Sequence, residues 1–276
     1  MFTPREIAHV TVQVGKRKAA LPPQKALVMG ILAGWFIGLV CVGANAASAM
    51  AGSAGSGKLI SAMIFPAGLC MVVLAGAELF TGNNLMVMAL LERQIRLSHM
   101  LRNWALVYVG NVIGCISLAF LVSVSGELSL FDQAVAVTTI GGAAYKSAMP
   151  PLGALLLAIP CNVLVCLSTW MSFASKDVAG KAIAIYFPVL LFVISGFEHS
   201  IANVYFAASG LFAVQNPAYA VAAAAQGVDI SALRWDAFLG NNLLPVTLGN
   251  LIGGALLTGC VLWYVYLYRE PRQEGM

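Results

Sequence analysis

Long apolar stretches separated by short polar segments set the pattern of this chain. Six stretches are long enough to cross a membrane, and they cover residues 26–50, 59–91, 101–125, 151–174, 182–210 and 241–268. Each holds at least about 20 mostly apolar residues, which is the length that spans roughly 30 Å of hydrocarbon. The pattern therefore predicts an all-α membrane protein with six transmembrane helices.

Polar residues interrupt the second and fifth stretches in midspan. Both interruptions read G-x-E-x-x-x-x-N, at 76–83 and 196–203, and they lie 120 residues apart. Because a broken helix frees backbone N–H and C=O groups, the break must be buried in protein or face a wet cavity. We predict that helices 2 and 5 are broken. Glu78 and Glu198 then have a structural role, accepting hydrogen bonds from the opened turns, with a proton relay as the alternative.

The two halves of the chain match in further places. Six of the twelve residues from Asn103 agree with those from Asn242, and four of the six from Pro22 agree with those from Pro150. Since each half holds three spans, we predict a 3+3 inverted repeat of residues 26–125 and 151–268, with a pseudo-twofold axis in the membrane plane. Such an axis places the broken helices opposite each other. Gly110 and Gly249 would allow close approach of the helices around them.

Composition and charge support a membrane protein and orient it. The chain is 60% hydrophobic and 9% charged, whereas soluble domains carry about 25% charged residues. Twelve of the 15 Lys and Arg residues lie at the termini and in the second and fourth loops, so the positive-inside rule predicts that both termini are cytoplasmic. The net charge of +4 then reflects topology and not a nucleic-acid partner. We expect a cytoplasmic segment at 1–25, a channel domain at 26–268 and a cytoplasmic tail at 269–276.

The N-terminal segment has an amphipathic character of its own. Val10, Val12 and Val14 alternate with polar and charged residues between Thr3 and Ala20. The alternation is not cleanly helical, but it is compatible with a helix at the cytoplasmic surface.

The sequence offers little for catalysis or for a cofactor. The six cysteines lie in apolar stretches without a CxxC pair, so we interpret them as small buried hydrophobes, and we expect no metal and no cofactor. An intramembrane enzyme using Glu78, Glu198 and His199 is disfavoured, because the chain has no HExxH or paired-Asp motif. A water or glycerol pore would be expected to carry two Asn-Pro-Ala motifs, and the chain has none. A structural subunit that needs a partner chain is a further alternative.

Several polar residues are candidates for a pathway, and each has a plainer interpretation. His199 is a possible pore residue or a satisfied core histidine, and Thr81 is a possible donor or a hydroxyl bonded to its own helix. Asn250 could orient His199 or bond between helices. Lys146, just before Pro150, could attract an anion or be a solvated loop charge.

These motifs resemble those of the formate/nitrite transporter family, which also includes hydrosulfide channels. The resemblance rests on Glu78-Leu-Phe-Thr-Gly-Asn, Gly196-Phe-Glu-His-Ser-Ile-Ala-Asn and Leu244-Pro-Val-Thr-Leu-Gly-Asn, and it covers roughly residues 20 to 268. It implies an aquaporin-like protomer in a homopentamer, with one pore per protomer, in the cytoplasmic (inner) membrane of the cell. By position it puts Thr81 and His199 at the centre of the pore, Asn250 near the histidine, Asn162 in the pore wall and Lys146 at an anion-attracting vestibule.

The same resemblance implies two apolar constrictions. Plain core packing is the alternative for every one of their residues, which are Phe65, Leu69 and Phe192 on the outer side and Leu79, Phe80 and Val165 on the inner side. Some formate-type members are rich in histidine near the vestibule lysine, but this chain reads Tyr145-Lys-Ser-Ala. The identity of the anion therefore stays open.

The expected function is passage of a small monovalent weak-acid anion. Formate ranks first, followed by nitrite, hydrosulfide and short carboxylates. A bare anion loses several kcal/mol on desolvation, so we expect protonation near His199 to precede passage through the constriction. Lys146 would attract the anion, while Glu198 and Asn250 would orient the histidine ring.

Overall fold

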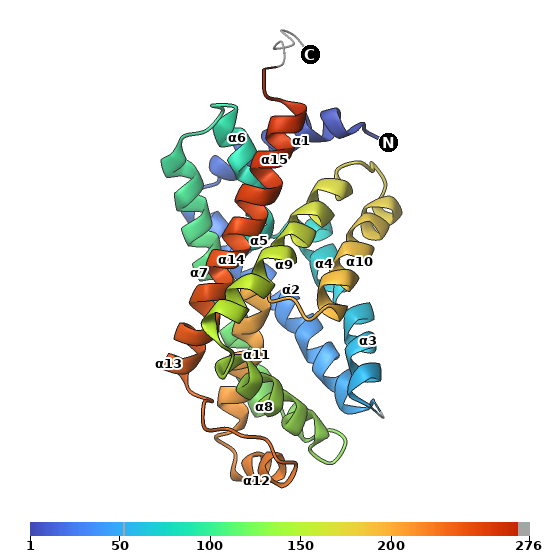
Figure 1. Ribbon diagram of the computed structural model, residues 1–276, viewed down its shortest axis with the longest axis vertical. Coiled ribbons are helices and arrows are strands. Elements are labelled where there is room, and N and C mark those ends of the chain that lie inside the picture. The colour runs from blue at the N-terminus through green and yellow to red at the C-terminus, as the bar shows by residue number, and fades with distance from the viewer. Residues whose placement is uncertain (52, 270–276) are drawn as a thin grey trace.

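The computed structural model describes residues 1–51 and 53–269, which form helices and no strand. Figure 1 shows an elongated bundle in which α1 and α6 lie at one end and α8 and α12 at the other. Short 3-10 turns at Asn84–Met86 and Glu127–Ser129 and π-helical turns at Leu239–Leu243 and Ile252–Cys260 join some of the helices. The helices are α1 (Pro4–Ala19), α2 (Pro23–Ala49), α3 (Ala54–Ile64), α4 (Pro66–Ala75), α5 (Phe80–Asn83), α6 (Val87–Leu91), α7 (Leu97–Ser125), α8 (Ala134–Ser147), α9 (Pro151–Ser172), α10 (Val178–Ile194), α11 (Ser200–Ala213), α12 (Pro217–Ala225), α13 (Trp235–Phe238), α14 (Leu244–Leu251) and α15 (Val261–Tyr266).

Five helical runs in the described residues are long and apolar enough to cross a membrane. They cover Pro23–Ala49, Ala54–Ala75, Leu97–Ser125, Pro151–Ser172 and Trp235–Tyr266. The second run continues after a break as Phe80–Leu91. The predicted fifth span consists of two shorter apolar helices, Val178–Ile194 and Ser200–Ala213. Neither piece alone is long enough to cross the hydrocarbon layer.

The predicted breaks in helices 2 and 5 are confirmed. α4 ends at Ala75, just before Gly76, and α10 ends at Ile194, two residues before Gly196. Both glycines have left-handed backbone angles, with φ of 80° and 72°. Glycine adopts this conformation without steric cost because it lacks a Cβ. After each break the chain is extended for a few residues and re-enters helix at Phe80 or Ser200.

Close packing of helices holds the two breaks in the middle of the bundle. A Cβ built on Gly110 would lie 2.5 Å from the carbonyl oxygen of Leu27, and one built on Gly249 would collide with the carbonyl oxygen of Leu155. α7 therefore packs directly on the backbone of α2, and α14 on that of α9. The prediction that these two glycines permit close approach is confirmed.

The N-terminal segment forms helix α1, and a capping box starts it. The Thr3 hydroxyl accepts from the N–H of Glu6, while the backbone N–H and hydroxyl of Thr3 donate to the Glu6 carboxylate. These bonds lower the pKa of the Glu6 carboxyl below its ordinary value.

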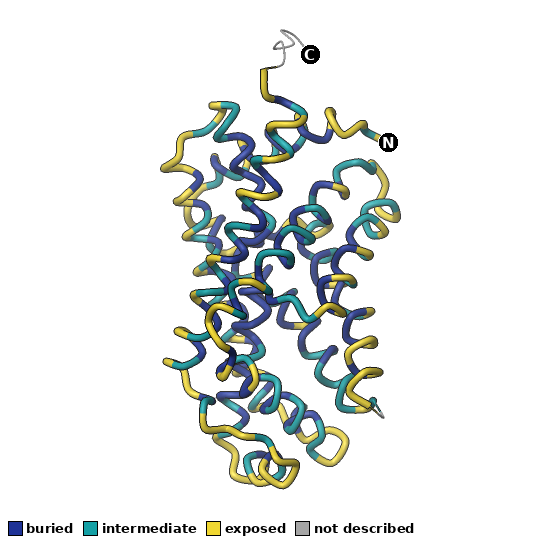
Figure 2. The backbone as a smooth tube through the Cα atoms, viewed as in Figure 1, coloured by how far each residue is buried: buried dark blue, intermediate teal, exposed yellow. Residues whose placement is uncertain are grey.

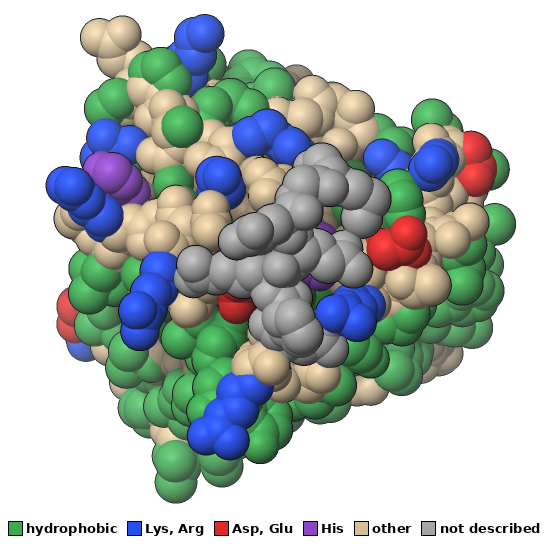
Figure 3. All heavy atoms as spheres, turned by 90° about the horizontal axis from the view of Figure 1, so that it is seen from above, with side chains coloured by type: hydrophobic (Ala, Val, Ile, Leu, Met, Phe, Trp, Pro, Cys, Tyr) green, Lys and Arg blue, Asp and Glu red, His purple; other side chains and the backbone are tan. Residues whose placement is uncertain are grey.

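One face of α1 is buried against the rest of the bundle (Figure 2). Of the three valines that the sequence singled out, only Val12 is fully buried, because the packing stripe also uses Thr11 and Gly15. Gly15 lies against Ala89 of α6. Figure 3 views this end of the molecule and shows Lys and Arg side chains spread around it.

Candidate functional site

Three cavities follow one another through the bundle. The cavity lined partly by α8, here the α8 cavity, has a volume of about 580 Å³, and the cavity lined partly by α1, the α1 cavity, about 370 Å³. Between them lies a central chamber of about 10 Å³. Phe65, Phe192 and His199 line both the α8 cavity and the chamber, while Leu69 and Leu79 line both the chamber and the α1 cavity. The three spaces therefore form one interrupted passage.

The central chamber is small and mostly apolar. Its walls are Ile37, Phe65, Leu69, Leu79, Val165, Val189, Phe192 and His199. A volume of this size accommodates about one water molecule. Five of the six predicted constriction residues line it. Ile37 and Val189 also line it, although no feature of the pattern distinguishes them from other apolar residues in their spans.

The sixth predicted constriction residue, Phe80, points elsewhere. Its ring packs edge-on against Tyr108 and Trp104 of α7, with centroid distances of 5.0 and 6.3 Å. It is not among the residues that line the three cavities. Phe80 therefore anchors the start of α5 to α7, which corresponds to the core-packing alternative.

His199 contributes the polar group of the chamber and contacts the other break directly. Its Nε2 lies 2.9 Å from the hydroxyl oxygen of Thr81, and its Nδ1 accepts from the N–H of Ala202 at 3.1 Å. A neutral imidazole has one donor and one acceptor nitrogen. Because Nδ1 accepts, the proton is on Nε2 and is donated to Thr81. The ring thus also caps the N-terminus of α11, where the positive end of the helix dipole favours a neutral ring.

Aromatic side chains hold the imidazole on its other faces. The Phe192 ring stacks on His199 with a centroid distance of 6.0 Å and an interplanar angle of 22°. Phe65 meets Phe192 edge-on at 5.8 Å. The imidazole therefore lies where the α8 cavity narrows into the chamber. Thr81 is fully buried and does not line the chamber itself. It contacts the His199 ring, which does.

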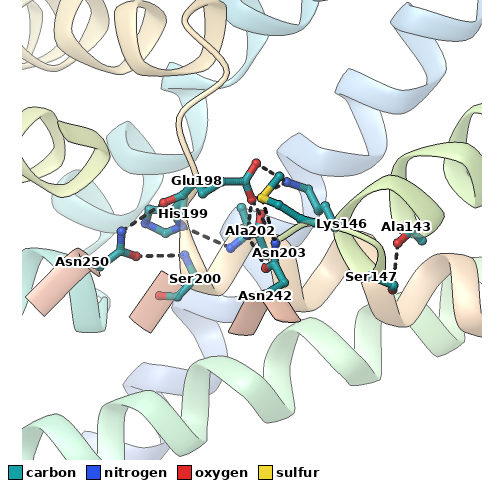
Figure 4. A network of polar contacts seen from close by, with 11 residues as sticks. Ala143, Lys146, Ser147, Glu198, His199, Ser200, Ala202, Asn203, Asn242 and Asn250 are labelled. Carbon is teal, nitrogen blue, oxygen red and sulfur yellow. Dashed lines mark hydrogen bonds and ion pairs between the residues drawn. The ribbon is translucent and has the colours of Figure 1, made fainter. Parts of the chain in front are cut away.

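Lys146 and Glu198 form a buried ion pair in the α8 cavity. The Lys146 Nζ lies 3.0 and 2.9 Å from the two carboxylate oxygens, and the amide of Asn203 donates to the same carboxylate at 2.5 Å (Figure 4). A second amide, from Asn242, donates at 3.4 Å. Lys146 lies in the last turn of α8, and its side chain is only 15% exposed. The alternative of a solvated loop charge is therefore wrong.

An equivalent cluster lies in the α1 cavity. Lys18 donates to Glu78 at 2.7 Å, and Asn83 donates to Glu78 at 2.6 Å and to Asn103 at 2.8 Å. The sequence analysis did not select Lys18. A signal was present, because Lys18 precedes Lys146 by 128 residues, the same separation as between the Pro22 and Pro150 motifs.

The freed backbone groups of the breaks bond to asparagines and not to the glutamates. Asn111 accepts from the N–H of Phe80 and donates to the carbonyl of Glu78. Asn250 accepts from the N–H of Ser200 and donates to the carbonyl of Glu198. The expectation that the carboxylates accept from the opened turns is thus wrong, because lysine and asparagine side chains occupy them.

Asn250 and Asn162 support the site from behind. Asn250 bonds to the backbone on both sides of His199 and not to its ring. The expectation that Glu198 and Asn250 orient the imidazole is therefore wrong, because the ring bonds to Ala202 and Thr81. Asn162 is fully buried and donates to the carbonyl of Asn250 at 2.7 Å. It does not line the three cavities. Both asparagines therefore position the breaks and do not form the wall of the passage.

Two cavities that each contain at least one lysine, joined by a small chamber across an apolar bundle, are typical of a membrane channel or transporter. Residues 5–264 of this chain match the protein family described as "Formate/nitrite transporter". The chain belongs to that family, which confirms the resemblance seen in its motifs.

Relatives with similar sequences cover nearly the whole chain. A protein called "Probable formate transporter" from Methanothermobacter thermautotrophicus is 35% identical over 96% of this chain and 97% of its own. "Formate channel FocA" from Escherichia coli K12 is 34% identical over 97% of this chain and 95% of its own. The family and these relatives are transporters and channels, so this chain is a membrane transporter and not an enzyme.

Solved structures share the fold. One described as "Pentameric formate channel with formate bound" superposes with a TM-score of 0.78 at 31% identity, covering 89% of this chain and 98% of the other. One described as "FNT family ion channel" gives a TM-score of 0.80 at 27% identity, covering 94% and 98%. The all-helical channel fold predicted from the sequence is confirmed.

Proposed function

We propose that this chain conducts a small monovalent weak-acid anion across the membrane, with formate as the first substrate. The single observation that carries the proposal is the closed chamber beside His199, between two cavities that each contain a lysine. The names of its relatives favour formate. Nitrite, hydrosulfide and short carboxylates are the alternatives, since all are monovalent bases of weak acids.

The chamber selects for a neutral species. It accommodates about one water molecule, so a hydrated ion does not fit. Removing the water from a charged carboxylate costs several kcal/mol even after relaxation of the protein. A neutral acid group costs only about 1–3 kcal/mol. Protonation at the entrance therefore lowers the barrier to passage.

His199 acts at this entrance as a neutral hydrogen-bond donor. Its Nδ1 lone pair is held by the N–H of Ala202, so the ring has no free site for a second proton. The Nε2–H, which donates to Thr81 at rest, donates to the arriving anion, and a proton that enters from bulk solution through the water of the α8 cavity neutralises the anion there. The Nε2–H donates to Thr81 again after the neutral acid has passed.

The two lysines act in the cavities on either side. Lys146 attracts the anion into the α8 cavity, and Lys18 is its counterpart in the α1 cavity. The glutamate beside each lysine forms an ion pair with it, which offsets part of the cost of burying the ammonium group. An anion then exchanges part of its hydration shell for donors on both sides of the chamber.

The protein works in the inner membrane with both termini in the cytoplasm, so that the α1 cavity faces the cytoplasm. The basic last turn of α1, with Lys16, Arg17 and Lys18, supports this orientation. Large apolar side chains that are more than half exposed, such as Leu152 and Phe187, suit contact with lipid or with neighbouring protomers. We propose a homopentamer in which each protomer has its own passage, as the pentameric neighbour suggests.

A competitive flux assay in liposomes containing the purified protein tests the proposal. We expect formate uptake that rises as the external pH falls from about 8 to about 5, because more anions are protonated at the entrance. Nitrite and hydrosulfide are added as competitors at each pH. Purified wild-type protein that carries none of these anions would contradict the proposed function. Preference for a competitor over formate would contradict only the choice of substrate.

A further inference from the structure

A second lysine lines the α8 cavity and differs from Lys146 in its partners. Lys58, on α3, lines this cavity together with Lys146, Glu198 and His199. In the described part of the chain, no carboxylate oxygen lies within the 4.0 Å ion-pair distance of Lys58. The residue is exposed.

The charges in the cavity make this difference important. Lys146 and Glu198 cancel each other, and the hydrogen bonds of His199 fit a neutral ring. The net positive charge among the lining side chains is therefore that of Lys58. Two N–H groups of Lys146 are occupied by the Glu198 carboxylate, and its ammonium also lies 5.7 Å from the ring centroid of Phe206. Lys146 is thus built into the wall, whereas the ammonium of Lys58 has its donors available.

The position of Lys58 on α3 fits a role at the mouth. Lys58, Ser61 and Phe65 are spaced i, i+3 and i+7, so they lie on one face of the helix, and all three line the α8 cavity. Phe65 also lines the central chamber. Seven residues of helix rise by about 10 Å, so Lys58 precedes the constriction by two turns, with the Ser61 hydroxyl between them.

We propose that Lys58 supplies the net positive field that concentrates small monovalent anions at the mouth of the α8 cavity. It is a positioning residue, because it acts before the anion reaches His199. The inference rests on the proposed anion flux and adds that Lys58, whose charge no carboxylate offsets, acts with Lys146 in setting the local anion concentration. Such focusing by one charge in a cleft raises capture at low substrate concentration and leaves the maximal rate unchanged.

A graded change of charge at this one position tests the inference. Formate flux is measured in liposomes for the wild type, K58R, K58Q and K58C, and for K58C labelled with an aminoethyl or a sulfonatoethyl methanethiosulfonate. We expect the half-saturating formate concentration to rise about three- to tenfold in K58Q and further in the sulfonate adduct. K58R and the aminoethyl adduct stay near the wild type. The labelled wild type, whose six cysteines are buried or half-buried, is the reagent control.

Salt dependence and a matched variant separate this field from a general effect of surface charge. The difference between K58Q and the wild type should shrink from about 0.01 M to about 1 M salt, as the Debye length falls from about 30 Å to about 3 Å. R234Q removes one exposed cation that does not line the α8 cavity, and it should leave the half-saturating concentration unchanged.

Two results overturn the inference. One is a half-saturating concentration in K58Q equal to that of the wild type at low salt. The other is a K58C protein whose flux is the same with either adduct. Both need wild-type protein that carries formate, so they differ from failure of the proposed function, in which the wild type itself carries none. Equal pentamer yield by gel filtration for all variants excludes misfolding as the cause.

Discussion

The two helix breaks share one framework and differ in the residue that each presents to the chamber. In both, a lysine pairs with the glutamate, two asparagines complete the cluster, and a third asparagine bonds to the freed backbone. At the position where the second break has His199, the first has Leu79, 120 residues earlier, and both line the chamber. The hydrogen-bonded framework is therefore present in both breaks, whereas the imidazole is present only in the second.

Four of the other six residues that line the chamber also form pairs related by the repeat. Ile37 and Val165 stand 128 residues apart, and Leu69 and Val189 stand 120 apart, at the separations of the repeated motifs. Each of these pairs is apolar on both sides. The imidazole is thus the polar group among apolar lining residues, and it interacts with the other half through Thr81. The comparison predicts that stability depends on both breaks alike, whereas conduction depends mainly on the one that carries His199.

The largest effect is expected when the asparagine that bonds to a break is removed. Asn111→Leu and Asn250→Leu each leave several buried backbone groups without partners, at about 1–3 kcal/mol per group. We expect each variant to lose about 4 kcal/mol of unfolding free energy, which denaturant unfolding in detergent would measure. Asn45→Leu, which removes a single half-buried bond to Thr139, is the control. Strongly unequal losses in the two variants would contradict the shared framework.

A somewhat smaller loss is expected when one ion-pair partner is removed. Lys18→Met or Lys146→Met leaves a buried carboxylate unpaired, and because each lysine is partly exposed we expect about 2–3 kcal/mol. Adding Glu78→Gln or Glu198→Gln to the respective variant should recover most of the stability in the same unfolding assay. Double variants no more stable than the single ones would mean that the lysines stabilise the bundle by packing alone.

Making the second break resemble the first should impair conduction and not folding. His199→Leu removes the donor at the chamber entrance, and a hydrogen bond to a charged group contributes about 1.5–3 kcal/mol. We therefore expect formate flux in liposomes to fall about tenfold to a hundredfold and to lose most of its rise at low pH. His199→Asn, which keeps an N–H donor, should retain more flux. Unchanged pH-dependent flux in His199→Leu would rule out a role for the imidazole.

The smallest effect concerns the contact between the halves. Thr81→Val keeps the shape of the side chain and removes one neutral hydrogen bond to the ring, a change of about 1 kcal/mol. We expect flux to fall about three- to tenfold, with Thr81→Ser close to the wild type in the same assay. Equal flux in Thr81→Val and the wild type would show that Phe192 and Ala202 hold the ring without Thr81.

The sequence predicted the fold well because its signals are local and strong. Apolar length fixed the spans, and the paired Gly-x-Glu motifs located the breaks at Gly76 and Gly196. The helix at the N-terminus was predicted, but its buried face was not, since Thr11 and Gly15 pack there and neither counts as hydrophobic. The 3+3 arrangement stays a prediction, supported by the matched contacts in both halves.

The candidate site was predicted less completely, because side-chain direction is not visible in a pattern. Phe80 and Leu79 are adjacent and equally apolar, yet only Leu79 faces the chamber. Asn162 and Asn250 were placed along the pore by the family resemblance, but their side chains bond to the backbone around the breaks. Lys18 was overlooked because a basic N-terminal segment also satisfies the positive-inside rule without any specific partner.

The size of the central chamber has a consequence for the cell that hosts it. A space of about 10 Å³ lined by aliphatic and aromatic side chains cannot hold a continuous file of water molecules. Sodium ions, potassium ions and hydrated protons then have no continuous water-filled pathway through the protomer. We therefore expect a membrane that contains many copies of the resting protein to keep its electrical potential.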